Sequence, residues 1–323
     1  MPESWAPQPP APAAHYQHDL LLHDSLGDLL AVAVPWLQAG LDAGEAVVIA
    51  TAEPTARLLR EALGEHEHLV VLERHDVYRA RTPAAITAYR RLAESKADAG
   101  HPRVRVLGET DFGPTARDWL EWQRYEAVIN EALGPLPLWG LCVYDCDRLP
   151  AEVVETGLRT HPFLATGQGR RPNPTYEDPA AFLRSLPVPD EPLEATEPLL
   201  AVDDVADYVG LRHAVAERLA QLGGSPDLVE DLHLAIDEMS SNAVRHGGPP
   251  VQLRLWASAD QVVCRISDGG AGMDDPFAGF GPAHGTDLSR GGMGLWLARQ
   301  LCDHVDVLDG DAGLTIRLST ALR

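Results

Sequence analysis

This sequence of 323 residues lacks several features that are diagnostic of particular classes of protein. Lys96 is the only lysine, so no lysine follows a glycine-rich loop and a P-loop for nucleotides is excluded. No apolar run approaches the roughly 18 residues that a membrane-spanning helix needs. The first residues, MPESWAPQPPAPAAH, lack the basic start and the apolar core of a signal peptide. We therefore expect a cytoplasmic protein with no membrane segment.

Positive charge and cysteine are also scarce. The formal net charge of −22 argues against a sequence-independent grip on nucleic acid and against adhesion to anionic membranes. The four cysteines include one close pair, Cys142 and Cys146, whereas zinc sites usually have two such pairs. The cysteines therefore predict free thiols in a reducing compartment and do not predict a zinc site.

The distribution of proline and apolar residues divides the chain into four segments. Residues 1–14 are rich in proline and alanine, which predicts a disordered tail. Residues 185–198, SLPVPDEPLEATEP, combine prolines with acidic residues and predict a linker. The remaining segments, 15–184 and 199–323, are each long enough to form a domain.

Short apolar runs alternate with helical patterns in the segment 15–184. The runs lie at residues 18–24, 45–51, 68–74, 103–109 and 138–145. This alternation predicts an α/β domain with a mostly parallel sheet that is covered on both faces. Ligands of such sheets bind at the C-terminal strand ends, where Glu109, Tyr144 and Asp145 fall.

Three histidines near the first run, His15, His18 and His23, are interpreted as structural residues. Glu126 lies with Trp119 and Trp122 in a predicted helix and is interpreted as part of an amphipathic face. A lone histidine or carboxylate in such a position is more often structural than a ligand.

The segment 199–323 has a different order of elements. Two helices are predicted first, at residues 205–222 and 226–246, followed by strands at 251–257 and 261–267. A glycine-rich region then leads to a short helix and two final strands, at 293–302, 304–309 and 314–319. Helices on one face of a mixed sheet would give an α+β two-layer sandwich.

A polar stripe follows the predicted helix at 226–246. Glu238, Asn242 and His246 are spaced by four residues, and Arg245 precedes the last of them. A carboxylate can take a proton, an amide oxygen can ligate Mg²⁺, and basic groups bind phosphate. The stripe favours a polyphosphate and metal site, although a solvated helix face would give the same pattern.

A first glycine motif follows the strand at 261–267. The strand ends at Asp268, and Gly270 and Gly272 come directly after it. A carboxylate at a strand end can accept a hydrogen bond from an adenine amine, and glycines allow a ligand to approach the backbone closely. The motif by itself would also fit a turn.

A second glycine motif, GGMGL at 291–295, opens the short helix. Gly292 and Gly294 can expose backbone N–H groups where the helix dipole favours phosphate. The stretch between the motifs, at 273–291, has little periodicity and predicts a lid that closes over a ligand.

The motifs DEMSSNAVRHG, SDGGAGM and GGMGLWLARQLCD, in this order, resemble the Bergerat-fold ATPases of the GHKL superfamily, and within it the RsbW-type anti-sigma-factor serine kinases. The resemblance spans residues 199–323 and implies ATP and Mg²⁺ as ligands. It implies that Glu238 is the catalytic base, that Asn242 ligates Mg²⁺ and that Asp268 binds adenine. Further nucleotide contacts are implied for Arg245, His246, Gly270, Gly272, Gly292, Gly294 and Thr315. The usual Gly-Thr pair of the family reads Gly313-Leu314-Thr315 here.

The size of the segment separates the members of that superfamily. A sensor histidine kinase needs a phosphoacceptor histidine on a helical hairpin, and only the helix at 205–222, with His213, precedes the nucleotide helix. Gyrase-like and chaperone-like members carry larger transducer domains. The length of the segment is compatible with the compact serine-kinase or anti-sigma members.

The segments HYQHDLLLHDSLGDLL, YEAVIN, LCVYD and LRTHP resemble the MEDS sensory domain, which implies a RecA-like α/β layer without a phosphate loop. The two resemblances together imply a cytoplasmic regulator whose sensory domain controls a kinase acting on Ser or Thr of an anti-anti-sigma protein. One alternative is an ATP-dependent switch that sequesters a sigma factor without significant turnover. Another gives the main activity to the first domain, as a receptor for a small-molecule signal. A homodimer is compatible with each of these readings.

Overall fold

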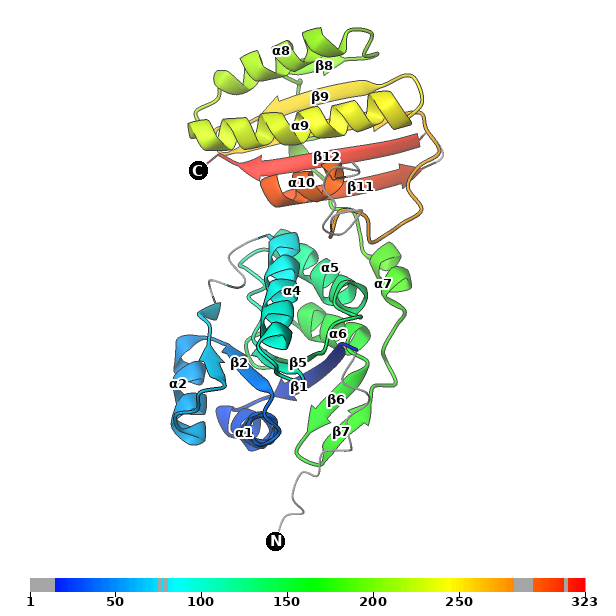
Figure 1. Cartoon of the computed structure of the whole chain (residues 1–323). Coiled ribbons are helices and arrows are strands. Elements are labelled where there is room, and N and C mark those ends of the chain that lie inside the picture. The colour runs from blue at the N-terminus through cyan, green and yellow to red at the C-terminus, as the bar shows by residue number, and fades with distance from the viewer. Residues whose placement is uncertain (1–14, 75–76, 78–80, 282–292, 311–312, 323) are drawn as a thin grey trace. The chain divides into compact units, whose positions relative to one another are not determined.

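The computed structural model describes residues 15–74, 77, 81–281, 293–310 and 313–322. The chain divides into two compact units, Met1–Leu186 and Pro187–Arg323 (Figure 1). In the described part of the chain, no helix combines the length and the apolar composition that crossing a lipid bilayer requires.

The first unit is an α/β layer built on a seven-stranded sheet with the order β3-β2-β4-β5-β1-β6-β7. Neighbouring strands run parallel except β6 and β7, which form an antiparallel pair at one edge. This confirms the predicted α/β class with a mostly parallel sheet. The elements are β1 (Gln17–His23), α1 (Leu26–Asp42), β2 (Ala46–Ala50), α2 (Glu53–Leu63), β3 (Leu69–Val71), α4 (Thr82–Asp98), β4 (Val104–Gly108), α5 (Ala116–Ala132), β5 (Leu138–Asp145), α6 (Ala151–Thr160), β6 (Phe163–Thr166), β7 (Gly169–Pro172) and α7 (Pro179–Ser185).

Helices cover both faces of this sheet. Helices α1 and α2 lie on one face, and α4, α5 and α6 lie on the other (Figure 1). Strand β2, AVVIA, is buried at every residue, as expected for a strand between two helical layers. Helix α5 begins with a capping box between Thr115 and Asp118, which satisfies backbone N–H groups at its start.

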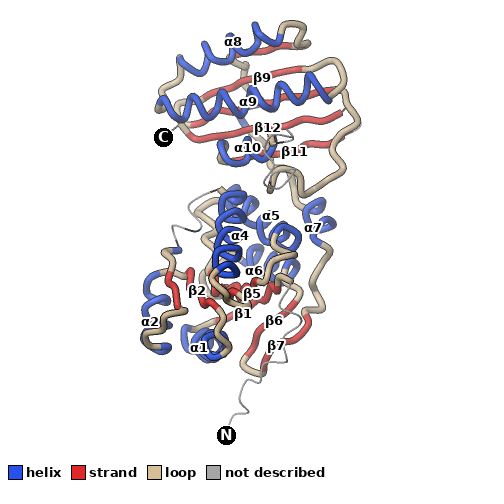
Figure 2. Tube along the Cα trace, in the orientation of Figure 1, coloured by secondary structure: helices blue, strands red, loops and turns tan. Residues whose placement is uncertain are grey.

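The second unit is a two-layer α+β sandwich. Its sheet has the order β11-β12-β10-β9-β8, and helices α8, α9 and α10 lie on one face (Figure 2). All four strand pairings are antiparallel, so the predicted mixed sheet is wrong. For two of these pairings the reason is that only a few residues separate β9 from β10 and β11 from β12, which is too few for a parallel crossover. The elements are η1 (Pro192–Ala195), β8 (Leu200–Val202), α8 (Tyr208–Ala220), α9 (Pro226–His246), β9 (Gln252–Ala257), β10 (Gln261–Asp268), α10 (Gly294–Leu301), β11 (His304–Gly310) and β12 (Gly313–Ala321).

Helix α9 organises this unit. The Ser225 side chain accepts the backbone N–H of Leu228, and Pro226 occupies the first turn, so the helix begins where the sequence predicts. Its apolar stripe packs on the sheet through side chains that include Leu232, Ile236, Met239 and Ala243. Alternate residues of β10 complete the same core: Val262, Cys264 and Ile266. By this alternation Asp268 belongs to the helix-facing side of the sheet.

The segment predicted as a linker, residues 185–198, makes specific contacts with the second unit. The Glu194 carboxylate pairs with Arg265 at 3.3 Å. The indole N–H of Trp256 donates a hydrogen bond to the Thr196 carbonyl oxygen at 3.0 Å. The Arg317 guanidinium donates a hydrogen bond to the carbonyl oxygen of Pro189. These contacts hold much of the segment against the second unit.

Candidate nucleotide site and a buried polar cluster

Two polar side chains of α9 lie against the first residue of α10. Glu238 and Asn242 are half-buried and one helical turn apart. Neither makes a hydrogen bond or an ion pair within the described residues. A β-carbon added to Gly294 would lie 2.5 Å from the Asn242 side-chain nitrogen and 3.2 Å from a Glu238 carboxylate oxygen. A side chain at position 294 would therefore displace the ends of these side chains, so glycine lets α10 begin in contact with them.

Asp268, at the end of β10, holds a loop against the end of α9. Its Oδ1 accepts the backbone N–H of Gly270 at 2.8 Å and that of Gly248 at 3.4 Å. The Gly269 N–H donates to the Gly248 carbonyl oxygen at 2.6 Å, which joins the loop after β10 to the loop after α9. The other Asp268 oxygen, Oδ2, has no hydrogen-bond partner in the described part of the chain. That oxygen can accept a hydrogen bond from a ligand.

Thr315 does not join these residues. It pairs with Ser267 across the β10–β12 ladder, and its hydroxyl donates a hydrogen bond to the Ser267 hydroxyl at 2.8 Å. Its neighbours Leu314 and Ile316 pack into the core beneath the helices, so Thr315 points to the opposite face of the sheet. This orientation argues against the contact with adenine that the resemblance implies for Thr315. Leu314, the partner of Asp268 in the ladder, takes the helix-facing position.

The structure describes three of the other residues for which nucleotide contacts are implied, and a fourth lies outside the described residues. Arg245 and His246 are exposed in the last turn of α9, next to the loop that Asp268 holds. Gly272 has a φ of 84°, in the left-handed region that glycine adopts without strain. Gly292 lies outside the described residues, as does residue range 282–291 of the predicted lid.

The arrangement has the chemistry of a nucleotide site. A carboxylate and an amide that have no partner among the described residues face the N-terminus of a helix, where backbone N–H groups favour phosphate. Asp268 offers a free acceptor oxygen close to the end of the same helix α9, because a β-carbon on Gly247 would lie 2.4 Å from the Asp268 carboxylate carbon. The structure thus groups Glu238, Asn242, Asp268 and Gly294 along the last turns of α9.

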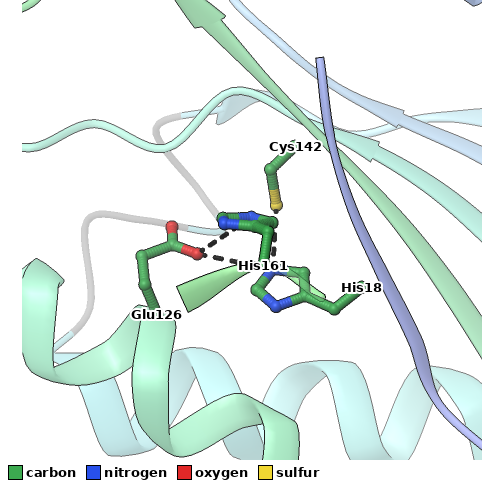
Figure 3. A group of neighbouring side chains, drawn as sticks. All are labelled: His18, Glu126, Cys142 and His161. Carbon is green, nitrogen blue, oxygen red and sulfur yellow. Dashed lines mark hydrogen bonds and ion pairs between the residues drawn. The ribbon is translucent and has the colours of Figure 1, made fainter. Parts of the chain in front are cut away.

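A second group of polar side chains, which the sequence patterns did not predict, is buried in the first unit. It comprises His18 on β1, Glu126 on α5, Cys142 on β5 and His161 at the end of α6 (Figure 3). All four are at most 8% exposed, and one ligand atom of each lies within 4.8 Å of those of the others. His18 and Glu126 are far apart in sequence, and no spacing rule joins them to Cys142 or His161. Burial of a histidine close to a buried carboxylate is a signal that only a three-dimensional structure carries.

Hydrogen bonds fix the orientation of both imidazoles in this cluster. Nδ1 of His18 lies 3.2 Å from the Asn130 side-chain oxygen, and Nδ1 of His161 lies 2.8 Å from the Gly157 carbonyl oxygen. An oxygen of this kind only accepts, so each Nδ1 carries the hydrogen and each Nε2 carries a lone pair. Burial lowers the pKa of both histidines to about 3, and burial raises the pKa of the Glu126 carboxyl. The imidazoles are therefore neutral near pH 7.

Two family models match the chain, one in each unit. Residues 17–162 match the MEDS family, the methanogen/methylotroph DcmR sensory domain. Residues 202–320 match the histidine kinase-like ATPase domain. The first match contains the whole buried cluster, and the second contains the candidate nucleotide site.

Curated relatives match the second unit. The serine-protein kinase RsbW of Bacillus licheniformis is 34% identical over 128 residues, which cover 36% of this chain and 79% of that protein. The serine-protein kinase RsbW of Bacillus subtilis strain 168 is 30% identical over 128 residues, with the same coverage of 36% and 79%. The anti-sigma F factor of Clostridium beijerinckii is 31% identical over 109 residues, which cover 32% of this chain and 76% of that protein.

Proposed function

Since the chain belongs through its second unit to the family of the RsbW serine-protein kinases, and carries a histidine kinase-like ATPase domain, we propose that it is an ATP-dependent protein serine/threonine kinase. The proposed substrate is a hydroxyl group of an anti-anti-sigma protein. The MEDS sensory domain at residues 17–162 would control the transfer in response to a signal, for which we propose a small molecule.

The observation that carries this proposal is the pair Glu238 and Asn242. Both are half-buried, both lie against Gly294, and both lack partners among the described residues. Polar side chains that only support the fold are usually hydrogen-bonded where they are buried, whereas these two are half-buried and make no such bond among the described residues. Two such groups beside a helix N-terminus are instead suited to contact a ligand.

Each residue would have a distinct task in phosphate transfer. The Glu238 carboxylate would accept the proton of the attacking hydroxyl. The Asn242 side-chain oxygen would ligate Mg²⁺, which neutralises phosphate charge when it is bound. Oδ2 of Asp268 would accept a hydrogen bond from the adenine amine, and the backbone at Gly294 would face phosphate oxygens. We propose Arg245, His246, Gly270, Gly272 and Gly292 as further nucleotide contacts.

The test is a transfer assay with γ-labelled ATP, Mg²⁺ and the anti-anti-sigma proteins encoded in the same genome. The expected result is stable label on a serine or threonine of one of them. Glu238→Gln should remove the label, and Glu230→Gln should retain it, because Glu230 is an exposed carboxylate two turns earlier on the same helix. Undiminished labelling by Glu238→Gln would overturn the catalytic role of Glu238.

A second candidate function is an ATP-dependent switch that sequesters a sigma factor. The similarity to an anti-sigma F factor favours it. In this case the full chain would bind a sigma factor in the presence of Mg·ATP, and no anti-anti-sigma protein would become labelled. Binding together with labelling would instead mean that one protein performs both tasks.

A further inference from the structure

We propose that His18, Glu126, Cys142 and His161 bind one divalent transition-metal ion, and that zinc is the ion that this ligand set fits. The ligand atoms would be Nε2 of both histidines, Oε2 of Glu126 and Sγ of Cys142 (Figure 3). This proposal concerns the first unit and does not depend on the kinase activity of the second.

Three of the six distances between the ligand atoms are close to the edges of a coordination tetrahedron, and one ligand atom of each residue lies within 4.8 Å of those of the others. Around zinc, two nitrogen or oxygen ligands lie about 3.3 Å apart, and a nitrogen and a sulfur lie about 3.6 Å apart. Oε2 of Glu126 lies 3.4 Å from Nε2 of His18 and 3.6 Å from Nε2 of His161. Sγ of Cys142 lies 3.4 Å from Nε2 of His18. The side chains are therefore already spaced as ligands of one ion.

The atoms that face one another are mostly acceptors. The hydrogen bonds at Nδ1 leave a lone pair on Nε2 of each histidine. Nε2 of His161 and Oε2 of Glu126 are buried and make no hydrogen bond in the described part of the chain. Lone pairs that converge on one point repel one another unless a cation or a proton lies between them. A metal ion would satisfy all of them at once.

The surroundings hold the ligands as a metal site requires. Metal-binding histidines usually donate their other N–H to an oxygen, and both histidines do so here. The second Glu126 oxygen, Oε1, accepts a hydrogen bond from the Thr110 hydroxyl at 3.0 Å. Hydrogen bonds with Asn130, Gly157 and Thr110 thus orient three of the side chains that would hold the ion.

The charges also favour a divalent ion. Glu126 is fully buried, and among the described residues the basic side chains within ion-pair distance of its carboxylate are the two histidines, which are neutral. A carboxylate and a thiolate together carry two negative charges, which a divalent ion neutralises and a monovalent ion does not. A thiolate with two imidazoles selects zinc and similar transition metals over Mg²⁺ or Ca²⁺.

Four protein ligands would close the coordination sphere. Closed zinc sites are structural, whereas catalytic sites keep a position for water or substrate. The ion would tie together β1, α5, β5 and the end of α6, which are otherwise held by packing and hydrogen bonds. We therefore expect the metal to stabilise the first unit.

The experiment uses the full chain. The metal content of the purified protein is measured, the metal is removed with a chelator, and Zn²⁺ or Co²⁺ is then added back. The expected result is one ion per chain, a rise in thermal unfolding temperature on addition of Zn²⁺, and with Co²⁺ the strong visible bands of a tetrahedral site with a thiolate-to-metal transition in the ultraviolet. Absence of stoichiometric binding by the wild-type chain would overturn the proposal, whatever the variants do.

Two cysteine variants then identify the sulfur ligand. Cys142→Ser should abolish the thiolate transition and weaken metal binding by more than the roughly 10–100-fold seen for outer-shell changes. Cys146→Ser is the matched control, since Cys146 lies four residues further along outside the cluster, and it should leave the spectrum unchanged. If Cys142→Ser does not fold, Glu126→Gln provides a second variant of nearly equal shape. A Cys142→Ser chain that keeps the thiolate transition, or a Glu126→Gln chain that keeps full affinity, contradicts the assigned ligand set.

Discussion

The two polar clusters of this chain are built in opposite ways. Around the nucleotide site, Glu238 and Asn242 belong to one helix, are half-buried and lack partners among the described residues. In the first unit, the cluster of His18, Glu126, Cys142 and His161 draws on four elements and is closed to solvent. We infer that Glu238 and Asn242 contact a ligand that binds reversibly, and that the buried cluster of the first unit contributes to the stability of that unit. Substitutions in the two clusters should therefore separate an effect on activity from an effect on stability.

The largest expected effect is that of Glu238→Gln on phosphate transfer. Loss of a general base lowers the rate by about 10²–10⁴-fold. Because Glu238 has no partner in the described structure, the thermal unfolding temperature should stay within experimental error of the wild type. Single-turnover transfer rates and differential scanning calorimetry measure the two quantities. A large loss of stability would mean that Glu238 belongs with the structural cluster.

A smaller effect is expected for Asp268→Ala on nucleotide affinity. A hydrogen bond to a charged group contributes about 1.5–3 kcal/mol, which corresponds to roughly 10–100-fold in the dissociation constant for ATP. Calorimetric titration with Mg·ATP measures this dissociation constant. Asp231→Ala serves as the control, because Asp231 lies on α9 and its side chain has no hydrogen-bond or ion-pair partner among the described residues. Wild-type affinity in Asp268→Ala would remove Asp268 from the adenine site.

Glu126→Ala is expected to lower stability and to leave nucleotide binding unchanged. Removing this buried carboxylate leaves the Thr110 hydroxyl without its acceptor and removes buried packing volume beside the two histidines. We expect the free energy of unfolding of the metal-free chain to fall by about 1–3 kcal/mol, with the affinity for Mg·ATP unchanged. Denaturant unfolding and nucleotide titration are compared with those of Glu131→Ala, an exposed change on the same helix. Weakened ATP binding in Glu126→Ala alone would show that the two clusters are coupled.

The smallest effect is expected for Thr315→Val. The hydroxyl donates to Ser267 on the face of the sheet away from the helices, so its loss should cost about 0.5–1.5 kcal/mol of stability. The dissociation constant for ATP should change by less than about twofold, a difference of roughly 0.4 kcal/mol. A tenfold weaker affinity for ATP would place Thr315 in the nucleotide site and would contradict the orientation that we infer from the strand register.

Helix α9 shows how much of the fold is readable from the sequence. The cap at Ser225, the proline at 226 and the apolar stripe through Leu232 and Met239 predict its bounds, and the structure confirms them at Pro226–His246. The α/β class of the first unit is equally predictable from its alternating runs. Strands β6, β7 and β8 were missed, because each has three or four residues and too little periodicity to separate it from a loop.

The order of strands is harder to predict. The sequence favours a mixed sheet in the second unit, whereas all the described strand pairs of that unit are antiparallel. A strand pattern specifies which residues face the core but not which neighbour it joins. That choice depends on turn length and on packing against helices that come from elsewhere in the chain.

Local sequence patterns predict the elements of the proposed nucleotide site. The polar stripe at intervals of four follows the helix period, and the glycines after Asp268 and at Gly294 supply backbone freedom. Tertiary structure alone decided two other matters. It turned Thr315 away from the helices, because register fixes the face of every side chain in a strand. It also brought His18, Glu126, Cys142 and His161 within 4.8 Å, because parallel pairing of β1 with β5 and packing of α5 and α6 join residues that no local spacing connects.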